Sequence, residues 1–270
     1  MGVSPLSFNN VERRIVRPRG SPLDITARLA LDDQTRADAF AIRHASYLAG
    51  GYIDPQPHGL FTDSDDLKPG SHSIVIYKDK RPVASVRICL ADLDPALSGW
   101  DEIPASRIFP EAVAALGQNV AAGRPARLLE INRLVRHPDF STDYQLVVVL
   151  FSFVGFMQGE TDCDLMLSCV RQNHSTFYKR MDFGYIAGPR RYAGVKFETN
   201  LMACLNKSYG VAAKTTAFFG PQSGPIVDYA GFMAGDSVKV FTDVLPTARR
   251  IMTETRTILQ DQVPAVRAAG

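Results

Sequence analysis

The chain has 270 residues, of which 46% are hydrophobic and 21% are charged. This composition is typical of a folded globular protein and argues against disorder. The net charge of +2 gives no reason to expect a nucleic-acid-binding protein. The cysteines are scattered, and no histidine has a cysteine or histidine neighbour at ligand spacing, so we expect reduced thiols, no metal site and a cytoplasmic location.

Hydrophobic periodicity predicts a mixed sheet with helices on both faces. Strands are expected at residues 25–31, 73–77, 82–90, 128–135, 164–170 and 195–205, and helices at 33–48, 112–116, 146–157, 173–181 and 248–259. The run 146–157 is shorter than the roughly 20 residues of a membrane span, and the first residues lack a signal-peptide pattern. We expect an arm at 1–22, one domain at 23–205, and a C-terminal extension at 206–270 packed on that domain.

The predicted strand 128–135 carries charged side chains inside an apolar run, with Glu130 and Arg133 three residues apart. An unpaired buried charge is costly, so these groups either pair with each other or line a site. Strand side chains alternate between faces, so the two point in opposite directions unless a β-bulge intervenes. Thr142 and Gln145 have the spacing of a capping box at the start of the following helix.

Further polar residues precede this strand. Arg43 and Tyr47 are four residues apart on the first predicted helix and share one of its faces. The loop 49–72 is long and carries Tyr52 together with Asp63 and Asp66. Crowded carboxylates of this kind indicate a solvated turn, a cation site or an amine-binding site. Arg87 places another charge inside the predicted strand 82–90.

In this order, these residues resemble one branch of the GNAT N-acyltransferase superfamily, which contains the bacterial N-acyl amino acid synthases and the acyl-homoserine-lactone (autoinducer) synthases. The resemblance covers roughly residues 25–205 and includes His174-x-x-Phe177-Tyr178 near its end. The sequence segments 51–53 and 130–135 resemble the amino-acid-acylating subgroup more than the lactone synthases. The resemblance implies an α/β fold with a GNAT-like, mostly antiparallel central sheet flanked by helices. The loop 49–72 is longer than in compact lactone synthases, and the last 65 residues match nothing we can place.

Members of this fold that use coenzyme A carry a glycine-rich loop that binds the diphosphate. Residues 136–143 contain no glycine and include Pro138, Asp139 and Asp143, which suit a diphosphate poorly. The resemblance therefore implies an acyl-carrier protein as donor. Carrier proteins are acidic, so a basic docking patch is expected, with candidates Arg124, Arg127, Arg136, Lys179, Arg180, Arg190 and Arg191.

The chemistry of amide formation assigns roles to these residues. Glu130 is the candidate base that removes the amine proton. Arg43, Arg87 and Arg133 either hold the acceptor's carboxylate or order the acidic loop. Asp63 and Asp66 either fix these arginines or bind the acceptor's ammonium group, and Tyr47 and Tyr52 suit a bulky apolar side chain. Candidates for the lining of an acyl slot, or for ordinary core, are Phe109, Leu150, Phe153, Val154 and Met166.

Three functions remain open at this point. The first is an N-acyl amino acid synthase that uses a long-chain acyl-carrier-protein thioester and no cofactor. Its product could associate peripherally with a membrane. The second is an acyl-homoserine-lactone synthase that uses S-adenosylmethionine. The third is a catalytically silent acyl-binding or ligand-binding module, favoured if Glu130 is buried against Arg133 with no cavity beside it. A coenzyme-A acetyltransferase is a weaker alternative.

Overall fold

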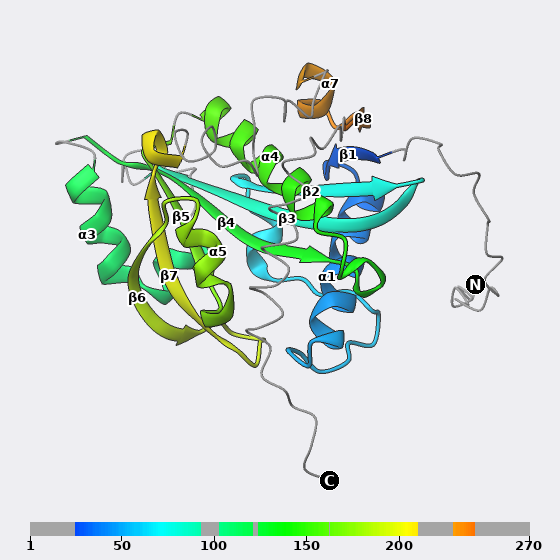
Figure 1. Cartoon of the computed structure of the whole chain (residues 1–270), viewed down its shortest axis with the longest axis horizontal. Helices are drawn as coiled ribbons and strands as arrows, with labels where there is room; N and C mark the ends of the chain where they lie inside the picture. Colours follow the sequence, from blue (N-terminus) through cyan, green and yellow to red (C-terminus); the bar gives the residue numbers. More distant parts are fainter. Residues whose placement is uncertain (1–24, 93–102, 121–123, 162, 210–228, 241–270) are drawn as a thin grey trace, which may run out of the picture.

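The computed structural model describes residues 25–92, 103–120, 124–161, 163–209 and 229–240. Its strands form one sheet in the order β6-β7-β5-β4-β3-β2-β1-β8 (Figure 1). The strands are β1 (Ile25–Leu29), β2 (Ser71–Lys78), β3 (Arg81–Asp92), β4 (Arg127–Arg136), β5 (Leu165–Val170), β6 (Gly184–Arg191), β7 (Glu198–Leu205) and β8 (Val238–Lys239). The pair β4 and β5 is parallel, and the other neighbouring pairs are antiparallel. The structure thus confirms the predicted fold class.

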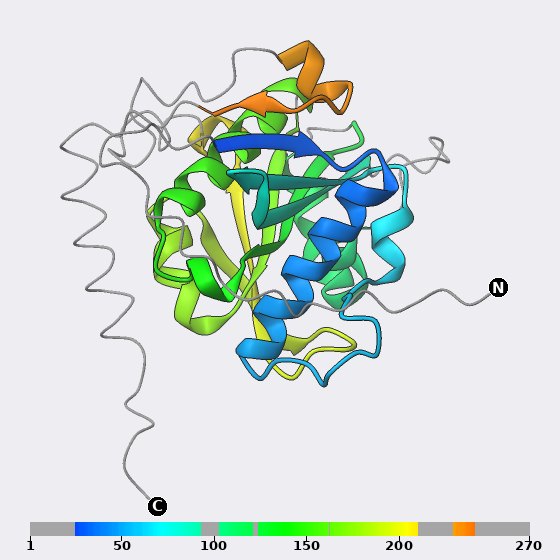
Figure 2. The same ribbon diagram turned by 90° about the vertical axis from the view of Figure 1, so that its right-hand side faces the viewer.

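Helices cover both faces of the sheet. They are α1 (Asp33–Ala49), α2 (Pro104–Ile108), α3 (Pro110–Val120), α4 (Gln145–Thr161), α5 (Ser175–Lys179) and α7 (Tyr229–Met233), with 3₁₀ turns η1 (Ser64–Leu67), η2 (Pro138–Phe140) and η3 (Gln172–His174). Val75 packs in the cluster that contains α1, whereas Ile74 and Ile76 pack in the cluster that contains α4. Because strand residues alternate between faces, α1 and α4 lie on opposite sides of the sheet (Figures 1 and 2).

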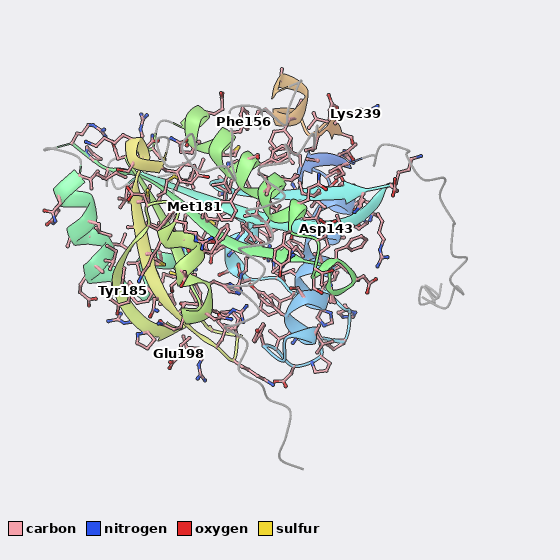
Figure 3. The ribbon with its side chains drawn as sticks, viewed as in Figure 1. Asp143, Phe156, Met181, Tyr185, Glu198 and Lys239 are labelled. Carbon is pink, nitrogen blue, oxygen red and sulfur yellow. The ribbon has the colours of Figure 1, made fainter. Side chains whose placement is uncertain are left out.

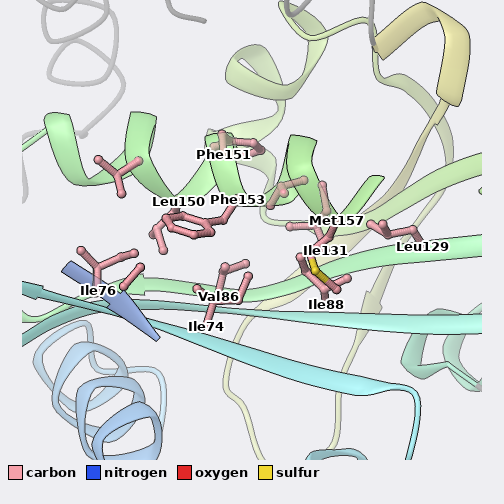
Figure 4. Packing of buried hydrophobic residues seen from close by; sticks show 14 of the residues in the cluster. Ile74, Ile76, Val86, Ile88, Leu129, Ile131, Leu150, Phe151, Phe153 and Met157 are labelled. Carbon is pink, nitrogen blue, oxygen red and sulfur yellow. The ribbon is translucent and has the colours of Figure 1, made fainter. Parts of the chain in front are cut away.

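The main core lies between α4 and the centre of the sheet. Leu150, Phe153 and Met157 of α4 face Ile74 of β2 and Ile88 of β3, and all five side chains are fully or almost fully buried (Figure 4). Burying each such side chain stabilises the fold by roughly 1.5–3 kcal/mol. Among the described residues, no helix is both long enough and apolar enough to cross a bilayer.

Most predicted elements are confirmed, but β6, β8, α2 and α7 were missed. The strand β6 contains Gly188 and Pro189, two residue types that argue against a strand. The proline is tolerated because β6 lies at the edge of the sheet. The predicted capping box is wrong, because Asp143 rather than Thr142 accepts the Gln145 N–H at the start of α4. The arm at 1–22 and the helix at 248–259 lie outside the described residues. In the described part of the C-terminal extension, β8 pairs with β1, and Phe232 of α7 stacks on Phe153 at 4.8 Å.

The parallel pair β4 and β5 separates part of the way along its length. The two strands pair from Leu128 with Leu165 to Ile131 with Ser168. Beyond Ile131, β4 continues to Arg136 along β3 while β5 ends at Val170. The backbone of β4 therefore has no strand partner on its β5 side over this stretch, and a cavity opens there.

Candidate active site

A β-bulge in β4 determines where Arg133 points. Arg87 pairs with Asn132 and Ser85 pairs with Val135, so Arg133 and Leu134 together stand opposite one residue of β3. Arg133 adopts φ 51°, which is uncommon for a residue other than glycine. An extra residue reverses the alternation of faces. Arg133 consequently lies on the same face as Asn132, beside the acidic loop.

The predicted arginines and aspartates form one continuous ion-pair network. Arg43 Nη1 donates to both oxygens of Asp66, at 2.9 and 2.8 Å. Arg87 Nη1 donates to Asp66 at 2.8 Å and to Asp63 at 2.5 Å. Arg133 Nη2 completes the series with a 2.6 Å bond to Asp63. Side chains from α1, η1, β3 and β4 are thereby held together.

The network holds the loop 49–72 against the sheet. Arg43 and Arg87 are each 1% exposed, so their charges require the carboxylates as partners. Burial acts to raise the pKa of Asp63, but Arg87 and Arg133 hold it well below its usual range. Asp63 also caps η1, where Asp66 accepts the Asp63 N–H. Arg43 and Arg87 therefore order the acidic loop, which is the second of their two expected roles.

Glu130 is fully buried, and its partners come from segments distant in the sequence. The N–H of Ala105 in α2 donates to Oε2 at 2.8 Å, and the Tyr192 hydroxyl donates to Oε1 at 3.1 Å. Burial raises the pKa of Glu130 to about 7, although these hydrogen bonds and the charge of Arg87 oppose the rise. Arg107 of α2 pairs with Asp65, which ties α2 to the acidic loop. Glu130 can thus gain or lose a proton near neutral pH.

The structure does not pair Glu130 with Arg133. Among the described residues, Glu130 forms no ion pair, and Arg133 pairs with Asp63. Of the two alternatives that the sequence left open for these residues, a structural Glu130–Arg133 pair is therefore wrong. Our reading of the sequence missed Asn132, which acts to lower the pKa of Glu130, and Tyr192, which donates a hydrogen bond to Glu130. Asn132 stands inside the segment that we had singled out, whereas nothing in the sequence around Tyr192 indicates its role.

A cavity of about 310 Å³ occupies the gap between β4 and β5. Its apolar wall includes Ile131, Val147, Phe151 and Phe177, and its polar wall includes Arg133, Arg136, Arg171, His174 and Cys169. The Tyr192 hydroxyl donates to Glu130 at 3.1 Å and lies close enough to the cavity residue Cys169 to influence its pKa. The buried carboxyl is therefore one hydroxyl group away from the cavity wall.

None of the five residues expected to line an acyl slot lines this cavity. Leu150, Phe153, Val154 and Met166 are buried in the main core, and Phe109 is buried in a second cluster beneath α2 and α3. The correction has a simple cause. The helix α4 is apolar on most of its surface, so its sequence does not indicate which side faces the gap, and Val147 and Phe151 face it instead.

Aromatic rings form the end of the cavity nearest α1. Tyr47 and Tyr52 both line it, and Phe197 packs edge-on against Tyr52 at 5.2 Å. The position of the Tyr52 ring requires a glycine at residue 50, because a Cβ atom there would overlap the ring. Arg171 lies over the Tyr52 ring at 4.3 Å and donates to its hydroxyl.

The seven basic residues expected to form a docking patch are not together. Arg127 and Arg136 are at opposite ends of β4, roughly 30 Å apart for a strand of this length. Arg124 pairs with Asp164, Arg190 donates to the Ile108 carbonyl, and Arg136 lies in the cavity wall. Lys179 and Arg180 follow the cavity residues Phe177 and Tyr178 and are exposed.

The loop 136–143, which the resemblance aligns with the diphosphate-binding loop of coenzyme-A-dependent proteins, carries carboxylates that are already paired. Asp139 pairs with Arg81, and Asp143 pairs with Lys78 at 2.9 Å. Asp143 also accepts the Gln145 N–H at 3.2 Å, so a carboxylate occupies the N-terminus of α4 (Figure 3). A helix N-terminus is a common position for a ligand phosphate, and here that position is taken.

Comparisons with known proteins agree with this geometry. A solved structure of FeeM, an N-acyl amino acid synthase from uncultured soil microbes, is 18% identical and has a TM-score of 0.57, over 71% of this chain and 96% of that one. A coenzyme-A-dependent acyl-homoserine lactone synthase, BjaI, is 15% identical with a TM-score of 0.51, over 74% and 92%. At these identities the likeness is one of fold. No curated protein matches the chain. The family model "N-acyl amino acid synthase FeeM" matches residues 38–205, more than half of the chain, and the chain therefore belongs to this acyltransferase family.

Proposed function

We propose that this protein transfers a long-chain fatty acyl group from acyl-carrier protein to the amine of an amino acid and releases an N-acyl amino acid. The observation that carries the proposal is the buried carboxyl of Glu130, which has a pKa of about 7. It lies next to a cavity that has one apolar and one cationic wall. A group with this pKa can accept a proton at neutral pH. The cavity volume lies at the lower end of the range for ligand pockets, roughly 300–1,000 Å³.

The proton follows a short route in this proposal. The neutral amine attacks the thioester carbonyl, and its nitrogen then loses a proton to the Tyr192 hydroxyl while Tyr192 passes its own proton to Glu130. The carbon–sulfur bond breaks, the carrier's thiolate leaves, and Glu130 returns the proton to that sulfur. Backbone N–H groups of β4 beyond Ile131, which have no β5 partner, can donate to the developing oxyanion.

The loop before α4 supports a carrier-protein thioester over a coenzyme A thioester. A diphosphate at that loop would meet the carboxylates of Asp139 and Asp143, and Pro138 has no N–H to donate. The exposed cations Lys179 and Arg180, next to the cavity residue Tyr178, suit an acidic carrier protein. Docking of the carrier at that end would lead its acyl chain toward Phe177, Phe151 and Val147.

The charge of the cavity supports an amino acid over S-adenosylmethionine as acceptor. The lining contains three arginines and no carboxylate. Both acceptors present an α-carboxylate that such a wall attracts, but S-adenosylmethionine also carries a sulfonium cation, which the wall repels. The rings of Tyr47 and Tyr52 suit an aromatic or bulky apolar side chain.

Turnover with matched donors tests the proposal. Dodecanoyl thioesters of acyl-carrier protein and of coenzyme A are each mixed with a panel of amino acids or with S-adenosylmethionine, and the products are identified by mass spectrometry. We expect acyl amino acid to form, and to form faster from the carrier protein. Equal or faster turnover with coenzyme A would contradict the donor assignment, and lactone without acyl amino acid would contradict the acceptor assignment.

A further inference from the structure

Of the three arginines in the cavity wall, two have no ion-pair partner among the described residues, and one of these two is Arg171. Arg133 pairs with Asp63, and Arg43 and Arg87 pair with Asp66. Among the described residues, by contrast, no carboxylate forms an ion pair with Arg171, which follows the last residue of β5 and lines the cavity. A partly buried guanidinium without a counter-ion is a favourable place for an anion.

The guanidinium of Arg171 is held in position by neutral groups. It donates from Nη1 to the Tyr52 hydroxyl and from Nη2 to His174 Nε2, at 3.0 Å in the second case. His174 must be neutral to accept this bond. Burial and the charges of Arg171 and Arg136 lower the pKa of His174 to about 4, so the imidazole is uncharged at neutral pH. The positive charge of Arg171 is therefore positioned without being compensated.

Arg136, the other cavity arginine without an ion-pair partner among the described residues, has a different environment. It donates to the Asp143 carbonyl and lies over the Tyr144 ring, 5.1 Å from the centroid. The negative charge of Asp143 also stabilises its charged form. Arg171 instead lies against the aromatic end of the cavity, over Tyr52 and 5.5 Å from the Phe197 ring. The cavity thus has one charge near the loop before α4 and another beside the rings.

We infer that Arg171 binds the α-carboxylate of the amino acid acceptor, with Tyr52 and His174 as the residues that position its guanidinium. This inference rests on the proposed function, because it assumes that an amino acid is the acceptor. The side chain of that amino acid would then lie against Tyr47, Tyr52 and Phe197. Arg171 is consequently a residue that selects amino acids over simple amines.

Equilibrium binding of product-like ligands tests this role without turnover. The ligand pair is N-dodecanoyl-phenylalanine and N-dodecanoyl-phenethylamine, which differ only in the carboxylate, and calorimetry gives the two dissociation constants. We expect the parent to bind the acid about 10- to 100-fold more tightly. Arg171→Gln should abolish this ratio, and Arg171→Lys should keep part of it. Arg36→Gln, an exposed arginine of α1 paired with Asp33, is the matched control and should keep the parent's ratio.

Arg171 could instead bind a different anion, the phosphate of the carrier's prosthetic arm. A second pair of ligands tests this alternative. Dodecanoyl-phosphopantetheine is compared with dodecanoyl-pantetheine, and Arg171→Gln should leave this ratio unchanged. Loss of the phosphate preference, or an unchanged ratio for the carboxylate pair, would overturn the assignment. Tyr52→Phe removes the hydroxyl that holds the guanidinium and should reduce the carboxylate preference even if Arg171→Gln does not fold. A parent that binds both product-like ligands but transfers no acyl group would show failure of the proposed function alone.

Discussion

Replacing Glu130 with glutamine separates catalysis from stability. The amide keeps the size of the side chain, and its oxygen can still accept the Ala105 N–H. Its NH₂ group can donate to the Tyr192 oxygen, because a hydroxyl both donates and accepts. The variant therefore keeps a partner for the Ala105 N–H and for the Tyr192 oxygen, yet it cannot take up a proton. Loss of a general base costs on the order of 10²–10⁴ in rate, and we expect turnover to fall at least about a hundredfold.

The effect on stability follows from the shifted pKa. Folding raises the pKa of Glu130 from 4.5 to about 7, so the folded state binds more protons than the unfolded state between these values. Its contribution to stability therefore declines as pH rises through this window and becomes constant above it. The full decline is about 3 kcal/mol. Glutamine does not titrate, so the melting temperature of the variant should rise relative to that of the parent as the pH increases from 5 to 8, by about 2–4 °C for each kcal/mol.

Two measurements check this reasoning, namely kcat from product formation and melting curves across pH. Glu160→Gln, an exposed glutamate near the end of α4, is the matched control and should change neither quantity. In the parent, kcat should rise with pH to a plateau above about 7, because only ionised Glu130 accepts a proton. A folded Glu130→Gln variant with near-normal turnover would refute the assignment of the base. A variant that does not fold would refute the account of its hydrogen bonds.

Three further predictions follow from the same contacts. Tyr192→Phe removes the proposed proton relay and a hydrogen bond that lowers the pKa of Glu130, so kcat should fall and the acidic limb of the remaining activity should move to higher pH. Asp66→Asn removes the charge that Arg43 and Arg87 share and should reduce the free energy of unfolding in urea by roughly 3–5 kcal/mol. Leu150→Ala should cost roughly 2–5 kcal/mol without changing the preferred acyl length, whereas Val147→Phe, in the cavity wall, should shorten it. An unchanged length preference in Val147→Phe would contradict our placement of the acyl chain.

Much of the framework could be predicted because it depends on local patterns. Apolar runs on either side of a tight turn specify β2 and β3, and Asp32 caps α1 by accepting the Thr35 N–H. The resemblance to the acyltransferase branch also grouped Arg43, Asp63, Asp66, Arg87 and Arg133 in advance, and charged side chains within apolar segments require partners. The sequence did not indicate which of them pair, and the structure shows that the aspartates neutralise the arginines and leave Glu130 separate.

The details of the cavity could not be predicted, because they depend on contacts between distant residues. Ala105 and Tyr192 are 25 and 62 residues away from Glu130 along the chain. Arg171 meets Tyr52 across 119 residues. No periodicity or residue spacing in the sequence predicts such long-range contacts. The helix α4 is apolar on most of its surface, so its sequence also does not indicate which side faces the gap between β4 and β5.

The sequence by itself therefore determined the order of the strands along the chain, the charged residues at the centre of the sheet, and the resemblance to one acyltransferase branch. Only the tertiary structure decided that a bulge turns Arg133 toward the acidic loop, that β4 and β5 separate beyond Ile131, and that Val147 and Phe151 rather than Leu150 and Phe153 face the cavity. The physical reason is that local propensity acts over a few residues. The pKa of a buried carboxyl and the wall of a cavity depend instead on groups that only the folded chain brings together.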